Sequence, residues 1–182
     1  VLNMLERSLR AVAMLGACAV LSMGGPVWGK DTALPGGASS LQETYQDWQI
    51  ACRIVDKTKN CSMSQQQVGK KNQRVLAVEL QAGSDGAVTG VLVLPFGLLL
   101  DKGVTLQIDD KPALAPLRFR TCMPVGCLVP LSFDSDRVSS LGKGTALKLK
   151  AAGSDTGQEV VLTVSLKGFA AALDRMKTLA GS

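Results

Sequence analysis

The sequence predicts an all-β fold: one antiparallel domain, built as a sandwich or barrel-like arrangement, with a short helix near residues 135–141 and a helix at the C-terminus. Three observations predict it. Apolar and polar residues alternate in several short segments, polar turn sequences separate these segments, and no regular alternation of strands with helices appears. The length of 182 residues suits one domain. Because only 4% of the residues are aromatic, aliphatic side chains must form most of the core.

The expected strands are segments in which every second residue is apolar. In the first of them, Trp48, Ile50 and Cys52 share one face of a strand. The segments with this pattern are 48–54, 74–80, 104–109, 117–121, 146–150 and 159–166. Turn sequences rich in Gly, Asp and Lys lie between them, at 83–86, 101–103, 109–112, 141–144 and 153–157. Short strands joined by polar turns are typical of antiparallel sandwiches and barrels.

The segment VLVLPFGLLL, residues 91–100, breaks this alternation. A continuous apolar run that contains Pro95 and Gly97 predicts a strand buried on both faces, followed by a bend. The alternative is an exposed apolar ridge that docks a partner or a membrane surface. The sequence alone does not separate the two.

Two segments have helical spacing. The first begins with Asp134 or Ser135 as its N-cap, buries Val138 and Leu141, and is expected to end at Gly142. The second is the C-terminal segment, whose apolar face comprises Phe169, Ala172, Leu173 and Met176. A face this small is expected to cover one end of a sheet.

The first 29 residues have the features of an export signal. Arg7 and Arg10 precede an uncharged apolar run over 11–23, and Val27 and Gly29 provide a cleavage context before residue 30. Two alternatives remain open. The sequence LGAC, which ends at Cys18, is similar to a lipidation signal. An uncleaved segment would instead anchor the protein to a membrane, as an accessory subunit of a membrane protein complex.

The composition of residues 30–46 predicts a flexible leader between the signal and the domain, because Gly, Ser and Pro are frequent and apolar anchors are few. The folded domain is expected to comprise residues 47–182.

Four cysteines remain once the signal is removed: Cys52, Cys61, Cys122 and Cys127. An even number of cysteines in an exported chain predicts two disulfides in an oxidising compartment. The turn sequences between neighbouring cysteines favour the local pairs Cys52–Cys61 and Cys122–Cys127. The two crossed pairings stay open from the sequence.

The composition excludes several kinds of catalytic site. The chain has no histidine, so neither a Ser-His-Asp triad nor a mixed Cys/His zinc site can form. Four residues separate Cys122 from Cys127. In thiol oxidoreductases two residues typically separate the cysteines, and the first cysteine lies at a helix N-terminus. We expect no catalytic, cofactor or metal site. A periplasmic thiol-disulfide oxidoreductase, activated by Arg118 and Arg120, is the alternative.

The formal net charge of +5 is too small and too dispersed to favour nucleic-acid binding, and no small-molecule substrate is indicated. One basic stretch stands out, formed by Arg53, Lys57, Lys59, Lys70, Lys71 and Arg74. We expect a solvated face; the alternative is a binding patch for anionic lipid, lipopolysaccharide or an acidic partner.

The order of five segments resembles the invasion-associated locus B family of exported bacterial proteins. These segments are DWQIAC, CSMSQQQ, VLPFGLLLDKGVTLQID, LRFRTCMPVGC and VSLKGFAAALDRM. The resemblance covers roughly Tyr45 to Lys177. It implies a β-rich domain without known catalytic residues, in the periplasm or at the surface of a Gram-negative bacterium. The expected function is therefore non-enzymatic binding of a protein or another cell-envelope component, with a membrane protein complex or a host surface as further candidates.

Overall fold

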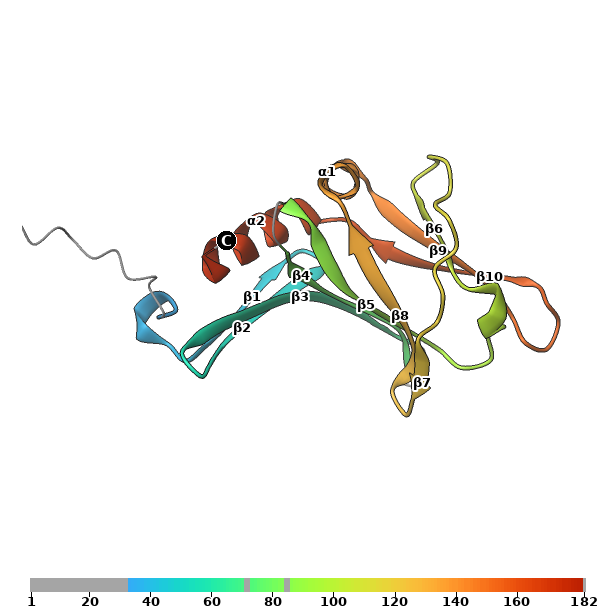
Figure 1. The fold of residues 1–182 in the computed structure, drawn as a ribbon, viewed down its shortest axis with the longest axis horizontal. Helices are drawn as coiled ribbons and strands as arrows, with labels where there is room; N and C mark the ends of the chain where they lie inside the picture. Colours follow the sequence, from blue (N-terminus) through green and yellow to red (C-terminus); the bar gives the residue numbers. More distant parts are fainter. Residues whose placement is uncertain (1–32, 71–72, 84–85, 182) are drawn as a thin grey trace, which may run out of the picture.

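The computed structural model describes residues 33–70, 73–83 and 86–181, which form two sheets and two α-helices (Figure 1). The strands are β1 (Ser40–Tyr45), β2 (Trp48–Val55), β3 (Thr58–Val68), β4 (Arg74–Ala82), β5 (Val88–Leu94), β6 (Thr105–Ile108), β7 (Thr121–Met123), β8 (Gly126–Phe133), β9 (Ala146–Ala152) and β10 (Glu159–Ser165). The helices are α1 (Ser135–Lys143) and α2 (Phe169–Ala180), with 3-10 turns η1 (Pro35–Gly37) and η3 (Leu100–Lys102).

All strand pairs are antiparallel. The larger sheet has the order β1-β2-β3-β4-β5-β8-β7, and the smaller sheet has the order β10-β9-β6. The larger sheet is curved, and its inner face is covered by α2 over β1–β4 and by the smaller sheet over the other half (Figure 1). The all-β prediction is confirmed in its sandwich form, because neither sheet closes into a barrel.

The core lies between these layers and follows the alternation of the strands. In β2, Trp48 and Ile50 are buried while the intervening Gln49 is exposed. The ring of Trp48 meets that of Phe169, the first residue of α2, edge to face with centroids 5.3 Å apart. This contact fixes the start of α2 against the larger sheet and adds to the apolar area that both rings bury.

Both predicted helices are present. Asp134 caps α1, since its carboxylate accepts a hydrogen bond of 2.8 Å from the backbone N–H of Arg137. The helix continues past Gly142, where the sequence predicted its end, to Lys143. It ends at Lys143 because the next residue, Gly144, is the C-cap, whose N–H donates to the carbonyl of Leu141.

The sequence predicted that the apolar run 91–100 is buried on both faces, and this prediction is wrong. Leu92 and Leu94 of β5 point into the core, while Val91 and Val93 are half-buried on the outer face. No described element covers that face of the sheet (Figure 1). The end of the run is open, because the side chain of Phe96 is 61% exposed.

The prediction of a flexible leader over 30–46 is wrong for its second half. Residues 40–45 form β1, which pairs with β2 from Ser40↔Arg53 to Tyr45↔Trp48. Upstream, Leu34 is only 2% exposed and belongs to the core. These residues are ordered because the tight turn at Gln46, with φ of 54°, folds β1 back onto its neighbour.

The expected signal peptide, with its cleavage site and the lipidation and anchor alternatives, lies outside the described residues. Of the helices that the structure describes, none has both the length and the hydropathy of a membrane span.

Candidate functional site

The first disulfide, Cys52–Cys61, joins β2 to β3 inside the core. The two cysteines are directly opposite each other in the strand register, with Cα atoms 4.1 Å apart. Their side chains are 1% and 9% exposed. This bond therefore cross-links the sheet beneath α2 and is shielded from solutes.

The second disulfide, Cys122–Cys127, joins the edge strand β7 to β8. These residues are again directly opposite, with Cα atoms 3.9 Å apart. Cys127 is buried, whereas Cys122 is exposed. Both pairs are the local ones that the turn sequences favoured.

The tip of the β7–β8 hairpin is held against β5. A Cβ atom on Gly126, whose φ is 131°, would come within 2.5 Å of the carbonyl oxygen of Leu94. Only glycine allows this close approach of two backbones. The disulfide and the glycine together fix the position of a hairpin whose outer strand has only three residues.

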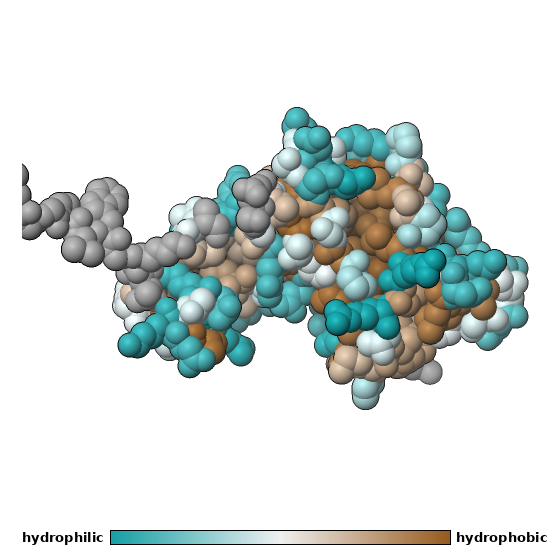
Figure 2. Space-filling view, viewed as in Figure 1, coloured by the Kyte–Doolittle hydropathy of each residue, from teal (hydrophilic) through white to brown (hydrophobic). Residues whose placement is uncertain are grey.

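The surface of this hairpin is apolar and basic. Met123 and Val125 are 50% and 54% exposed. Beside them, on the outer face of β5 and β8, lies a groove of ≈ 330 Å³ lined mainly by apolar atoms. Its lining comprises Gly90, Val91, Arg120, Thr121, Met123, Leu128 and Pro130. We call the hairpin, this groove and the adjoining Phe96 the hairpin surface; Figure 2 shows apolar residues gathered over the β7 hairpin, at the bottom of the view.

The chemistry of Cys122 is set by its place on an edge strand. It is not at a helix N-terminus, the position that lowers the pKa of a catalytic thiol. Among the residues that the structure describes, no cluster of three or more cysteine and carboxylate side chains could hold a metal ion.

The basic stretch does not form one patch. Lys57 lies in the turn before β3 and Lys70 in the turn after it, so the length of the strand separates them by about 30 Å. Arg53 and Lys59 lie closer along the sheet but on opposite faces, because Lys59 pairs with Ile54 and Arg53 with Asn60. Arg74, at the start of β4, donates to the side-chain oxygen of Gln66 at 3.2 Å. Lys71 lies outside the described residues.

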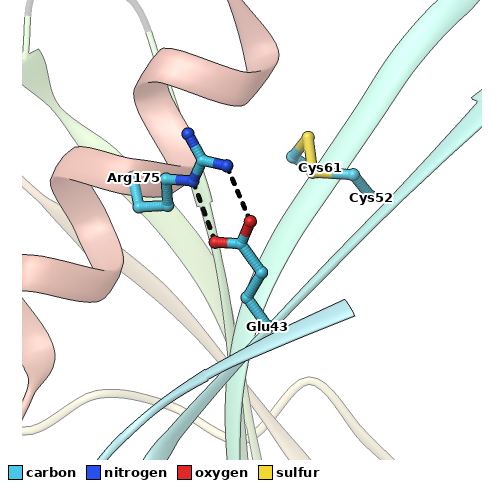
Figure 3. Close-up of a disulfide and its surroundings, with 4 residues drawn as sticks. All are labelled: Glu43, Cys52, Cys61 and Arg175. Carbon is cyan, nitrogen blue, oxygen red and sulfur yellow. Dashed lines mark hydrogen bonds and ion pairs between the residues drawn. A yellow bond between two sulfur atoms is a disulfide. The ribbon is translucent and has the colours of Figure 1, made fainter. Parts of the chain in front are cut away.

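A partly buried ion pair, which the sequence pattern did not predict, joins β1 to α2. Arg175 Nε and Nη2 donate to the two carboxylate oxygens of Glu43 at 2.8 and 2.7 Å (Figure 3). The hydroxyl of Tyr45 also donates to this carboxylate, at 3.0 Å. These hydrogen bonds, first of all those from Arg175, lower the pKa of Glu43, although burial opposes the shift. Figure 3 also draws the Cys52–Cys61 bond between β2 and β3.

Comparisons with known proteins agree with this architecture. Residues 48–177 match the model of the family described as invasion associated locus B protein. The chain belongs to the invasion associated locus B family. The matched span runs from β2 to α2 and includes both disulfides, whereas β1 and Leu34 lie upstream of it.

Relatives with similar sequences include proteins of Brucella and Bartonella. An invasion protein B homolog of Brucella abortus (strain 2308) is 49% identical over 148 residues, which are 81% of this chain and 85% of the relative. Invasion protein B of Bartonella bacilliformis is 40% identical over 148 residues, 80% of each chain. The crystal structure of invasion associated protein B from Bartonella henselae matches with a TM-score of 0.74 at 40% identity, covering 78% of this chain and 98% of that one.

The hairpin surface was only partly accessible to sequence reasoning. The run 91–100 raised the alternative of an exposed apolar ridge, and Phe96 is indeed exposed. The missed signal was the distribution of charge: from residue 111 to residue 133 the sequence contains Lys111, Arg118 and Arg120 but no Asp or Glu.

Proposed function

We propose that this member of the invasion associated locus B family is an exported binding protein of the bacterial cell envelope, cross-linked by two disulfides and without catalytic activity. The observation that carries the proposal is that all four cysteines outside the N-terminal segment are used to join neighbouring strands. Disulfides of this kind form in oxidising compartments outside the cytoplasm. They fix the shape of the surface around them, and their cysteines have no free thiol for catalysis. Both properties suit recognition rather than turnover.

The partner that we propose is a component of the cell envelope, reached through the hairpin surface. Its exposed apolar residues Met123 and Val125 lie beside an apolar groove, and exposed apolar residues that gather in this way are typical of interaction sites. A host-cell surface is the second partner class, because the relatives in Brucella and Bartonella are named invasion proteins.

Binding is tested with the exported protein immobilised on beads and incubated with envelope extract in mild detergent. We expect specific capture of an envelope component by the oxidised protein. A matched control carries Met123→Ser and Val125→Ser, which remove apolar surface from the exposed turn but leave the disulfides unchanged. Equal capture by both proteins contradicts the proposal, and so does the absence of binding by either protein both to the extract and to vesicles of envelope lipid.

The oxidoreductase alternative rests on the exposure of Cys122 and needs its own assay. We expect no free thiol in the native protein at neutral pH, and no acceleration of the reduction of a disulfide substrate such as insulin by dithiothreitol. Turnover that disappears in a Cys122→Ser/Cys127→Ser variant would overturn the non-enzymatic assignment.

A further inference from the structure

The hairpin surface has the form of a membrane-docking edge. Met123 and Val125 occupy the tip of a hairpin that projects from one end of the larger sheet (Figure 1). Phe96 follows β5 by two residues, and the pairing of Leu94 with Cys127 brings that end of β5 beside the hairpin. Three large apolar side chains, each at least 50% exposed, are thus held at one end of the molecule.

Cations accompany these apolar residues. Arg118 and Arg120 are exposed, and neither takes part in an ion pair or side-chain hydrogen bond within the described residues. Arg120 also lines the apolar groove. The chain from 111 to 133 contains no acidic residue, so the formal charge along this segment is positive. Across the sheet, the exposed Glu79 of β4 lies opposite Val91.

We propose that the hairpin surface docks on a bilayer that carries anionic lipids, with Met123, Val125 and Phe96 entering the interface and Arg118 and Arg120 meeting the headgroups. A projecting apolar tip enters the headgroup region easily, whereas a partner protein would need a matching hollow. Apolar insertion and attraction to anionic lipid act together in such interfacial binding. This proposal rests on the binding function proposed above and names its ligand.

The second disulfide makes the tip of this hairpin rigid. It closes the hairpin immediately behind the tip, because Cys122 and Cys127 flank the four residues 123–126. Gly126 holds the same turn against β5. A tip fixed in this way loses little conformational entropy when it enters an interface, so more of the binding free energy is retained.

The test is co-sedimentation of the exported, oxidised protein with two kinds of vesicle. One kind contains phosphatidylcholine alone, and the other also contains about 30% phosphatidylglycerol, which supplies anionic headgroups. We expect binding to the mixed vesicles that weakens as salt rises, and at least about tenfold weaker binding to phosphatidylcholine. Arg118→Gln/Arg120→Gln should weaken binding about 25-fold, since each cation near an anionic surface contributes roughly fivefold. Met123→Ser/Val125→Ser should weaken it about tenfold or more.

Matched controls use residues of the same type and exposure elsewhere. Val55→Ser/Val68→Ser replaces two valines that are 50% and 52% exposed. Lys57→Gln/Lys70→Gln replaces two exposed lysines in the turns on either side of β3. Lysine loss lowers the net charge as much as the arginine change does, so only a docking site at the hairpin makes the two results differ. Circular dichroism and the thermal midpoint check that every variant is folded.

Two results overturn the proposal: no binding to the mixed vesicles, or equal losses in hairpin and control variants. If vesicle binding is absent while Met123→Ser/Val125→Ser abolishes capture of an envelope protein, the hairpin surface docks a protein and the lipid proposal fails, although the binding function stands. If neither vesicles nor extract bind, both proposals fail.

Discussion

The side-chain amide of Gln65 pairs with the backbone of Ser165 as a neighbouring strand would. Gln65 Nε2 donates to the carbonyl of Ser165 at 3.0 Å, and its Oε1 accepts from the N–H of Ser165 at 3.0 Å. The two residues are 100 positions apart, on β3 of the larger sheet and β10 of the smaller one. One buried amide thus ties the two layers of the sandwich together.

Replacing Gln65 with Leu should therefore destabilise the protein by about 2 kcal/mol, because the N–H of Ser165 loses its acceptor in a half-buried position. The carbonyl of Ser165 keeps a second donor, Trp48 Nε1 at 3.0 Å. Chemical denaturation measures the change. The adjacent Gln66→Leu, at an exposed position, should change the free energy of unfolding by less than about 0.5 kcal/mol; similar losses at both positions would contradict the role of Gln65.

The Glu43–Arg175 pair predicts a pH dependence. The pKa of Glu43 is lowered in the folded protein, chiefly by hydrogen bonds from Arg175. The unfolded chain therefore binds this proton more readily, so the carboxylate stabilises the fold above its ordinary pKa of 4.5 and that stabilisation is lost as the pH falls through the lower folded value.

Glu43→Gln should lower stability by about 1 kcal/mol at pH 7, and the difference from the wild type should shrink below pH 4.5. Unfolding midpoints between about pH 7 and pH 3 provide the measurement. Glu159→Gln, at an exposed position, serves as the control. A difference that stays constant across the range would show that the ion pair is not responsible.

Substitutions at the two glycines that flank α2 distinguish two destabilising effects, steric overlap and backbone strain. Gly168 and Gly181 have φ values of 82° and 75°. A Cβ atom on Gly168 would lie 2.1 Å from the carbonyl oxygen of Tyr45, whereas one on Gly181 would meet nothing within 4 Å.

Gly181→Ala should cost about 1 kcal/mol, the penalty for a side chain in the left-handed region. Gly168→Ala should cost about 3 kcal/mol or more, because β1 and α2 must also move apart. Thermal and chemical unfolding of the two variants give the comparison. Equal costs would mean that α2 does not approach β1 as closely as described.

The disulfides should differ in their contribution to stability. Bond Cys52–Cys61 spans 9 positions and Cys122–Cys127 spans 5, so loop entropy favours the former slightly, with about 2.6 against about 2.1 kcal/mol. Removing the buried pair by Cys52→Ala/Cys61→Ala also leaves space in the core. We expect a larger fall in the unfolding midpoint for this variant than for Cys122→Ala/Cys127→Ala; the reverse order would contradict the assignment of the first bond to the core.

The sequence by itself determined the features that depend on local patterns. Alternation with a period of two identified the strand of Trp48 and its buried face, because side chains in a strand point to opposite sides in turn. Helical spacing identified the buried face of α2. The cysteine pairs were also accessible, since each pair is joined by a turn within a single hairpin and needs no knowledge of distant partners.

Only the tertiary structure decided which distant residues meet. The segment 40–45 contains few apolar residues, and its place as β1 follows from pairing with β2 and from the contact of Glu43 with Arg175, 132 positions away. Gln65 differs from Gln66 only in the face that it occupies. The basic stretch was dispersed by the length of β3 and by the alternation of its faces. Distances along the chain do not determine distances in space once strands pair, and this is why the hairpin surface, rather than the basic stretch, became the candidate for binding.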